Sequence, residues 1–349
     1  MALTPRGLLV EAGRTELYTK NTDFSSGWGL VGCTINPNAV TGPDGTASAD
    51  EVIEGTTTQQ SLGQLAINFT SGVTYIHRIY AKAKTRNWIA VYWDPNRFGG
   101  TGFNYFDVAN GVVGTASAGM TTLIRPAANG FYECIVIGTC TSTGAGNRSF
   151  WLANADGGRV YTGDGTSSLY IWGASLQVGA DVTQHIATDA VTVATAADTA
   201  LITNVASLTD QCWVVKARTP TKLPTGQANT VFQMDDGGNA NRRMIYYLNG
   251  RLYVVSTIGG VAQATLDMGL VANGTDFSIA ARFADANFAA SLNGGTLVTE
   301  TTAGRLNTLG MTTARIGAAA GGGFAWNSTI RYIETRRTAS DAELPLLAA

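Results

Sequence analysis

Short apolar runs separated by polar turn residues recur along the whole chain of 349 residues. Most runs are too short for a helix, and each is bounded by Gly, Asn, Asp or Pro, as the strands of antiparallel sheets are. Apolar residues at helical spacing nowhere extend beyond about two turns. The pattern predicts an all-β protein, with strands that include 65–69, 75–80, 88–93, 131–137, 149–153, 168–172, 212–217, 243–248, 251–255 and 277–281.

Two local signals add detail to this prediction. Asn249-Gly250 separates two strand-like runs, and because a two-residue type I′ turn needs positive φ at both positions, the pair predicts a hairpin. Near the end of the chain, Ser340 and Glu343 have the spacing of a capping box, in which each side chain satisfies a free N–H at the helix start. One short helix is therefore predicted over 341–347.

The spacing of the strands and a change in composition predict two β-sandwiches, the first of jelly-roll type. The predicted division is an arm over 1–20, a first sandwich over 21–180, a connector over 181–207 and a second sandwich over 208–349. The connector lacks glycine and aromatic residues, and it has room for an edge strand. The apolar run from Arg6 to Val10 has no local partner, so we expect it to pair with a neighbouring element or subunit, and we expect a homo-oligomer.

Charge excludes some classes of partner. Charged residues make up only 14% of the chain, and the net charge is −2. Binding a phosphate backbone requires clustered Lys and Arg, but the pairs Arg242-Arg243 and Arg336-Arg337 are isolated, so no nucleic-acid partner is expected. No apolar run approaches the roughly 20 residues of a membrane-spanning helix, and none near the N-terminus has signal-peptide length. We expect synthesis in a cytoplasm without membrane insertion.

Residues that carry catalysis are few in this sequence. His77 lies within an apolar run, His185 has no evident partner, and no Gly-x-Ser-x-Gly motif is present. Glycoside hydrolysis needs two carboxylates that act together, whereas the adjacent Asp235 and Asp236 would point to opposite faces of a strand. The chain is expected to be non-enzymatic and to need no cofactor. The four cysteines are expected to be buried and reduced: Cys33, Cys134, Cys140 and Cys212.

Several segments resemble bacteriophage and prophage proteins. They are Arg6-Gly-Leu-Leu-Val-Glu-Ala-Gly-Arg14, Asp23-Phe-Ser-Ser-Gly-Trp28, Gly42-Pro-Asp-Gly-Thr46, 154–166, 169–179, 183–188 and Ala196-Ala-Asp198. In this order, over roughly residues 6 to 200, they are similar to the carbohydrate-binding-module-like jelly rolls of phage tail-fibre, spike, head-fibre and minor structural proteins. The resemblance implies a place on a virion surface, synthesis in a bacterial cytoplasm and other virion proteins as partners.

The last third of the chain resembles concanavalin-like and laminin-G-like sandwiches. The residues that carry this resemblance are Ala314-Arg-Ile-Gly317, Trp326-Asn-Ser-Thr-Ile-Arg-Tyr-Ile333 and Ser340-Asp-Ala-Glu-Leu344. In that family they form a core strand, a strand leading into the terminal helix, and the helix itself. The resemblance implies a lectin-like sandwich, which by itself does not determine function.

Aromatic and amide side chains concentrate between residues 88 and 105. Side chains alternate along a strand, so Ile89, Val91 and Trp93 are expected in the core and Trp88 and Tyr92 on the opposite face. Aromatic rings stack on the apolar face of a sugar, and planar polar side chains bond its hydroxyls. The candidate glycan-binding residues are Trp88, Tyr92, Asp94, Asn96, Arg97, Phe103, Asn104 and Tyr105. The alternative is that the loop of 94–105 folds over its own domain.

Asp156 and Asp164 stand in a glycine-rich stretch. Carboxylates and backbone carbonyls of such loops can bind Ca²⁺, and jelly-roll modules often carry such a site. Acidic residues also occur in glycine-rich turns without any metal. The sequence leaves both interpretations open: a Ca²⁺ site at Asp156 and Asp164, or two turns without a metal ion.

These features together favour a non-enzymatic surface protein of a bacteriophage-like virion, of fibre, spike or decoration type, which binds host surface polysaccharide for attachment. One alternative is a structural adaptor or cement protein that uses the same sandwiches only to pack on its neighbours. The two differ in whether the aromatic loops face solvent or a subunit. A polysaccharide-degrading enzyme is a third interpretation.

Overall fold

The structure is a computed structural model. It describes residues 8–10 (backbone only), 13–64, 66–179, 182–189, 191–195, 198, 200–205, 210–220, 226, 228–301, 310–320 and 325–349. The chain forms two compact units. One, called the first sandwich below, contains 14–180 and 184–195, and the other, the second sandwich, contains 1–13, 181–183 and 196–349. The fold is all-β with a short C-terminal helix, as predicted.

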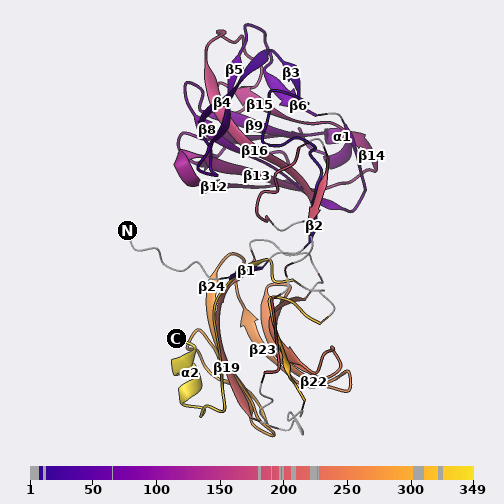
Figure 1. Ribbon diagram of the computed structural model, residues 1–349, viewed down its shortest axis with the longest axis vertical. Helices are drawn as coiled ribbons and strands as arrows, with labels where there is room; N and C mark the ends of the chain where they lie inside the picture. Colours follow the sequence, from indigo (N-terminus) through magenta and orange to yellow (C-terminus); the bar gives the residue numbers. More distant parts are fainter. Residues whose placement is uncertain are drawn as a thin grey trace. The chain divides into compact units, whose positions relative to one another are not determined.

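The first sandwich has two antiparallel sheets with a shared core (Figure 1). One sheet has the order β12-β13-β8-β16-β2-β17, with β5 paired to β16 and β4 to β5. Its strands are β2 Arg14–Glu16, β4 Cys33–Thr41, β5 Ala47–Glu54, β8 Thr74–Ala83, β12 Thr121–Pro126, β13 Tyr132–Thr139, β16 Ser168–Val178 and β17 Val193–Thr195.

The opposite sheet, called the β9 sheet below, has the order β11-β10-β9-β15-β6-β3. Its strands are β3 Gly29–Val31, β6 Ser61–Gly63, β9 Trp88–Trp93, β10 Phe103–Asp107, β11 Val112–Val113 and β15 Arg148–Ala153. The remaining elements are a two-stranded sheet of β7 Ile67–Phe69 and β14 Gly144–Gly146, the helix α1 Pro95–Phe98 and a 3₁₀ turn, Ala128–Gly130.

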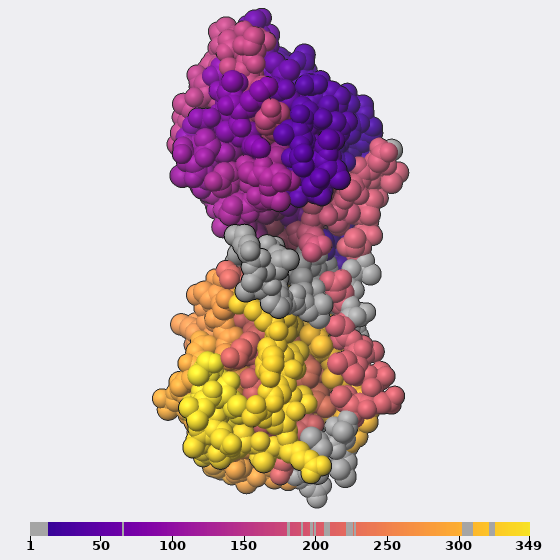
Figure 2. All heavy atoms as spheres, turned by 60° about the vertical axis from the view of Figure 1, so that its left-hand side comes forward, coloured from indigo at the N-terminus to yellow at the C-terminus, as the bar shows by residue number. Residues whose placement is uncertain are grey.

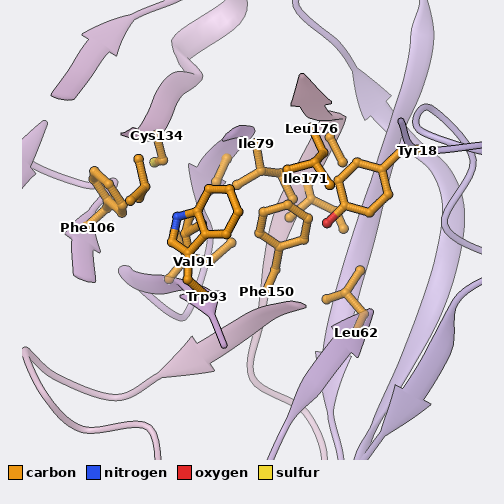
Figure 3. Close-up of a cluster of buried hydrophobic side chains, with 14 of the residues drawn as sticks. Tyr18, Leu62, Ile79, Val91, Trp93, Phe106, Cys134, Phe150, Ile171 and Leu176 are labelled. Carbon is orange, nitrogen blue, oxygen red and sulfur yellow. The ribbon is translucent and has the colours of Figure 1, made fainter. Parts of the chain in front are cut away.

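Apolar side chains from both sheets fill the core of the first sandwich. Ile89, Val91 and Trp93 are fully buried, as the alternation along β9 predicted. Figure 3 shows side chains of the β9 sheet packed with residues of the opposite sheet, among them Val91, Trp93, Phe106, Phe150, Ile79, Cys134, Ile171 and Leu176. Full burial of one such side chain contributes about 1.5–3 kcal/mol, so this layer is a main source of the stability of the unit.

The second sandwich also has two sheets, of order β1-β28-β19-β24-β25-β26 and β18-β27-β20-β21-β22-β23. The strands of the first are β1 Leu8–Val10, β19 Gln211–Arg218, β24 Asp276–Phe283, β25 Phe288–Leu292, β26 Val298–Glu300 and β28 Ser328–Arg336. Those of the second are β18 Ala200–Thr203, β20 Asn229–Asp235, β21 Arg242–Leu248, β22 Arg251–Ile258, β23 Val261–Leu270 and β27 Thr313–Ile316. The predicted hairpin is present, since Asn249 and Gly250 have φ of 50° and 84° between β21 and β22.

The C-terminal helix α2, Glu343–Leu347, packs through Leu344 against one sheet of the second sandwich, and Figure 2 shows the C-terminal residues in yellow on its surface. The prediction of a capping box is half correct. The Glu343 carboxylate accepts from the Ser340 backbone N–H at 2.6 Å, as expected. The Ser340 hydroxyl, however, donates to the same carboxylate instead of serving a helix N–H, so the helix begins later than predicted. No helix in the described part of the chain is long and apolar enough to span a bilayer.

The boundaries of the two units differ from the predicted ones. The predicted arm ends earlier, because β2 and the fully buried Tyr18 belong to the first sandwich. Glu16 explains this: its buried carboxylate accepts hydrogen bonds from the Leu176 N–H at 2.8 Å and the Ser175 hydroxyl at 2.6 Å, which ties β2 to β16. The predicted connector is divided as well, since β17 pairs with β2 and β18 pairs with β27.

The N-terminal run does have a partner within its own chain. Strand β1 pairs antiparallel with β28, with Leu8 opposite Ile330 and Val10 opposite Ser328. The pairing agrees with the first of the two partners expected for the run from Arg6 to Val10, a neighbouring element. Arg6 and Gly7 lie outside the described residues. The homo-oligomer stays a prediction, because β1 is itself an edge strand of its sheet.

Deleting residues 1–13 should therefore destabilise the second sandwich and leave the first unchanged. The lost ladder joins three residue pairs, so we expect the free energy of unfolding of the second sandwich to fall by about 1–3 kcal/mol. Calorimetry of the full chain and of the deletion variant resolves the transitions of the two units. This account of β1 would be contradicted if the deletion lowered the transition temperature of the first sandwich. It would also be contradicted if the transition temperature of the second sandwich did not change.

Both histidines of the chain lie in the first sandwich. The Tyr18 hydroxyl lies 2.7 Å from Nε2 of His77, and burial, reinforced by the charge of Arg148, holds the pKa of His77 well below its usual range. His185 packs on Trp172, with ring centroids 4.7 Å apart, and burial followed by the charge of Arg78 lowers the pKa of His185 to about 4. Both imidazoles are therefore neutral in the folded state near neutral pH.

Acid should destabilise the first sandwich through these histidines. Unfolded histidine binds a proton below about pH 6.5, whereas the folded groups do so only at lower pH, so a fall in pH between those values favours unfolding. We expect a loss on the order of 1–3 kcal/mol between about pH 7 and about pH 4, smaller in His185→Gln. Calorimetric scans across this range measure it. If the variant shows the same pH dependence as the natural chain, His185 is not responsible.

Candidate functional site

The outer face of the β9 sheet, opposite the core, carries the side chains that alternate with the core residues. The strand register aligns them in rows across the sheet. One row runs from small to aromatic residues: Gly29, Gly63, Ser149, Tyr92 and Phe103. The next row places Trp151 beside Ser61 and Ala90. Small residues in both rows leave space next to the rings.

This space is a groove of about 560 Å³. The small residues that form the floor of the groove lie on β3, β6 and β15: Gly29, Ser61, Gly63 and Ser149. The rings come from Tyr92, Phe103 and Trp151. The exposed Asn147 and the half-buried Arg159 also line it. The groove therefore combines apolar ring surface with amide, hydroxyl and guanidinium groups, but no carboxylate, histidine or thiol lines it.

The three rings support one another while each keeps part of its surface exposed. The ring centroids of Tyr92 and Phe103 are 4.6 Å apart, and those of Phe103 and Trp151 are 5.4 Å apart with the rings nearly perpendicular. The Trp151 indole N–H donates to the Ser149 hydroxyl at 2.8 Å, which fixes the ring orientation. Contacts of this kind contribute about 0.5–1.5 kcal/mol each, so the rings are preorganised before any ligand arrives.

Arg159 covers this aromatic cluster from a loop. Its guanidinium carbon lies 4.0 Å from the centroid of Phe103 and 5.4 Å from that of Trp151. The loop is held in two places: the Tyr105 hydroxyl donates to the Gly157 carbonyl at 3.3 Å, and Asp156 accepts from the Thr115 N–H at 2.7 Å. The position of Arg159 is therefore determined by both the rings and the loop anchors.

Four of the predicted glycan-binding residues share this outer face. Tyr92 and Phe103 are half-buried and line the groove. Tyr105 is nearly buried and Trp88 half-buried, and both lie on the same face without lining the groove. The alternation predicted for β9 placed Trp88 and Tyr92 on the face opposite the core, and the structure has them there.

The other four predicted residues, Asp94, Asn96, Arg97 and Asn104, do not line the groove. Asn104 is fully buried, because it alternates with Phe103 and Tyr105 and so faces inward, where its amide accepts from the Ser117 N–H at 3.0 Å. Asp94 caps α1 by accepting from the Asn96 N–H at 3.0 Å. Asn96 is exposed on that helix, and Arg97 donates to the Ala145 carbonyl at 2.9 Å.

Sequence reasoning missed Trp151 and Arg159 as groove residues. A signal for Trp151 existed, because Phe150 and Leu152 on either side of it are fully buried, which repeats the alternation of β9. No comparable signal identified Arg159, since it belongs to a loop and meets Phe103 only after the sheet has formed.

The two aspartates considered for Ca²⁺ serve as turn anchors. Asp156 accepts from both the N–H and the hydroxyl of Thr115. Asp164 accepts from the N–H and hydroxyl groups of Thr166 and Ser167, and these bonds hold the pKa of Asp164 well below its usual range. Within the described ranges no three Asp, Glu, His or Cys side chains cluster in a way that could hold a metal ion.

No protein-family model and no curated protein sequence matches the chain. Among solved structures, it is similar to the CBM40 of a Ruminococcus gnavus IT-sialidase bound to α2,3-sialyllactose, at 16% identity and a TM-score of 0.34 over 41% of this chain and 84% of that one. It is similar to a SAP-like pentraxin from Limulus polyphemus, at 16% identity and a TM-score of 0.33 over 41% and 72%. Mouse laminin α1 domains LG4-5 match at 11% identity and a TM-score of 0.29 over 83% and 89%. What the chain shares with them is the β-sandwich fold.

Asn104→Ala should destabilise the first sandwich, because it removes the acceptor of the buried Ser117 N–H and the donor to the Val91 carbonyl. An unsatisfied buried group costs about 1–3 kcal/mol. Denaturant unfolding of the variant measures this loss, with Asn96→Ala as the exposed control, expected within about 0.5 kcal/mol of the natural chain. Equal effects of the two substitutions would contradict the structural role of Asn104.

Proposed function

We propose that the chain is a non-enzymatic protein that binds host surface polysaccharide in the groove of the β9 sheet. The observation that carries the proposal is the cluster of Tyr92, Phe103 and Trp151, three partly exposed rings beside a floor of small residues. A sugar presents an apolar C–H face that packs on such rings, and its hydroxyls need polar partners of the kind that Asn147 and Ser149 offer.

The chemistry of the groove supports binding over hydrolysis. Glycosidases place two carboxylates about 5–10 Å apart on either side of the scissile bond. The residues that line this groove include neither aspartate nor glutamate. A sugar seated on the rings would therefore meet side chains that hold it and none of the usual groups that cleave it.

The setting that we propose is the surface of a bacteriophage-like particle made in a bacterial cytoplasm, where the chain acts in attachment to the host beside other virion proteins. The resemblance of residues 6 to 200 to phage fibre and spike modules supports this setting. A particle that displays many copies would turn weak single sites into firm attachment through avidity. In the alternative, an adaptor or cement protein, the groove would be covered by a neighbouring subunit.

Trp151→Ala and Tyr92→Ala should each weaken binding to host cells or purified polysaccharide. Loss of one stacking ring removes on the order of 1 kcal/mol beyond its buried area, which corresponds to about fivefold to tenfold in affinity. Tyr253→Ala is the matched control, because Tyr253 is half-buried and stacks on Tyr246 at 5.1 Å in the second sandwich. Stable groove variants that bind as well as the control variant would place the binding surface elsewhere.

Gly29→Val tests the groove without removing a ring. A Cβ at Gly29 would meet only the Gly63 carbonyl oxygen, at an ordinary distance of 3.5 Å, so a valine fits the strand and narrows the groove. At Gly63 the same atom would come within 2.8 Å of the Arg148 carbonyl oxygen, so that position is unsuitable. We expect Gly29→Val to keep the melting temperature and lose binding; binding that persists would show that the groove is not used.

A further inference from the structure

We infer that the polysaccharide taken by the groove is anionic and that Arg159 recognises its charged group, a carboxylate or a phosphate. This inference rests on the proposed function, since it assigns the class of sugar to the same groove. Arg159 and Arg148 are the two ionisable lining residues with a formal charge near neutral pH, and both are positive.

Of these two arginines, only Arg159 presents its charge to the groove. Arg148 is 3% exposed and alternates with the groove residue Ser149, and its guanidinium lies 4.8 Å from the centroid of the buried Tyr18 ring. Arg159 is half-buried on the groove side and covers the Phe103 ring. The groove therefore has one accessible cation next to its aromatic cluster.

Arg159 also differs from Arg86 and Arg78 of the same sandwich in its electrostatic partners. Arg86 makes two hydrogen bonds to the Glu54 carboxylate, at 2.6 and 2.7 Å, and Arg78 pairs with Glu133 at 2.7 Å. Among the described residues, no carboxylate lies within ion-pair distance of Arg159. Its side chain meets the rings of Phe103 and Trp151 and the hydroxyl of Tyr105. Its charge is not needed to fill space over Phe103, which a neutral side chain would also do. An anion in the groove supplies the missing partner.

The geometry suits an oxyanion. An arginine packed on a ring by its face keeps N–H donors at its edge, and these match the paired oxygens of a carboxylate or phosphate. The loop anchors at Tyr105 and Asp156 fix the side chain in advance, which lowers the entropy lost on binding. A sugar ring seated on Trp151 or Tyr92 would bring a charged substituent toward this guanidinium.

The test uses surface polysaccharide purified from a bacterial strain that the full-length protein binds. It is presented in native form, after reduction of its carboxyl groups to alcohols, and after removal of its phosphate groups. We expect Arg159→Gln to weaken binding of the native polymer by about tenfold or more, as expected for a lost charge-assisted hydrogen bond, with Arg159→Lys in between. One of the two chemical treatments should weaken binding by the natural chain as much, and it identifies the anionic group.

Arg337→Gln is the matched control, because it removes one exposed positive charge from the second sandwich and should leave binding unchanged. Raising the salt concentration should weaken binding by the natural chain more than by Arg159→Gln. The inference is overturned if Arg159→Gln binds like the natural chain, or if binding survives both treatments. If Trp151→Ala then still weakens binding, the proposed function stands and only the charge assignment fails. If no strain is bound at all, both fail.

Discussion

The two-residue period of strand β9 is the constraint on which the rest of the first sandwich depends. Ile89, Val91 and Trp93 must face the core to fill it, and the pleat then directs Trp88, Ala90 and Tyr92 to the other side. A shift of register by one residue would exchange the two sets and expose the core. The same hydrophobic burial that stabilises the unit therefore positions the rings of the groove, so that core packing and surface chemistry have a common origin.

Hydrogen-bond acceptors on side chains, buried at Glu16 and Asn104 and exposed at Asp156, determine which segments lie together. Glu16, Asn104 and Asp156 each satisfy backbone N–H groups of a segment distant in sequence, and each thereby fixes one strand or loop. Burial raises the pKa of Glu16, which shows that desolvation outweighs its hydrogen bonds there. A hydrogen bond to a buried acceptor forms only when the two segments have one particular alignment. Apolar contacts tolerate several alignments, so the buried acceptor specifies the register and they do not. The hydrophobic layer contributes most of the favourable free energy of folding, and these acceptors determine which loops lie beside the groove.

The sequence pattern correctly predicted the features that depend only on residues close together in the chain. The alternation of 88–93, the hairpin at Asn249-Gly250 and a C-terminal helix near Glu343 all follow from residues close in sequence. The pairing of β1 with β28 and the alignment of Trp151 with Ala90 depend on which strands become neighbours, and no local pattern encodes that. Asn104 shows a further limit: its polarity favoured an exposed position, but the pleat placed it inward and hydrogen bonds compensated. Of the groove residues, Tyr92 and Phe103 were in the predicted set, whereas Trp151 and Arg159, which lies on a loop, were not.

The strand pairing at the ends of the first sandwich has a consequence for how such chains diversify. The sequence of the second sandwich is interrupted, with β1 before the first sandwich and 196–349 after it. The interrupting segment starts and finishes at the same place, because Arg14 on β2 lies opposite Thr195 on β17 in an antiparallel pair. Because its two ends are close together, such a segment can be replaced by one of a different length without moving the residues of the second sandwich to which it is joined. Exchange at these two points would replace the groove as a whole, and of the second sandwich it would remove only residues 181–183.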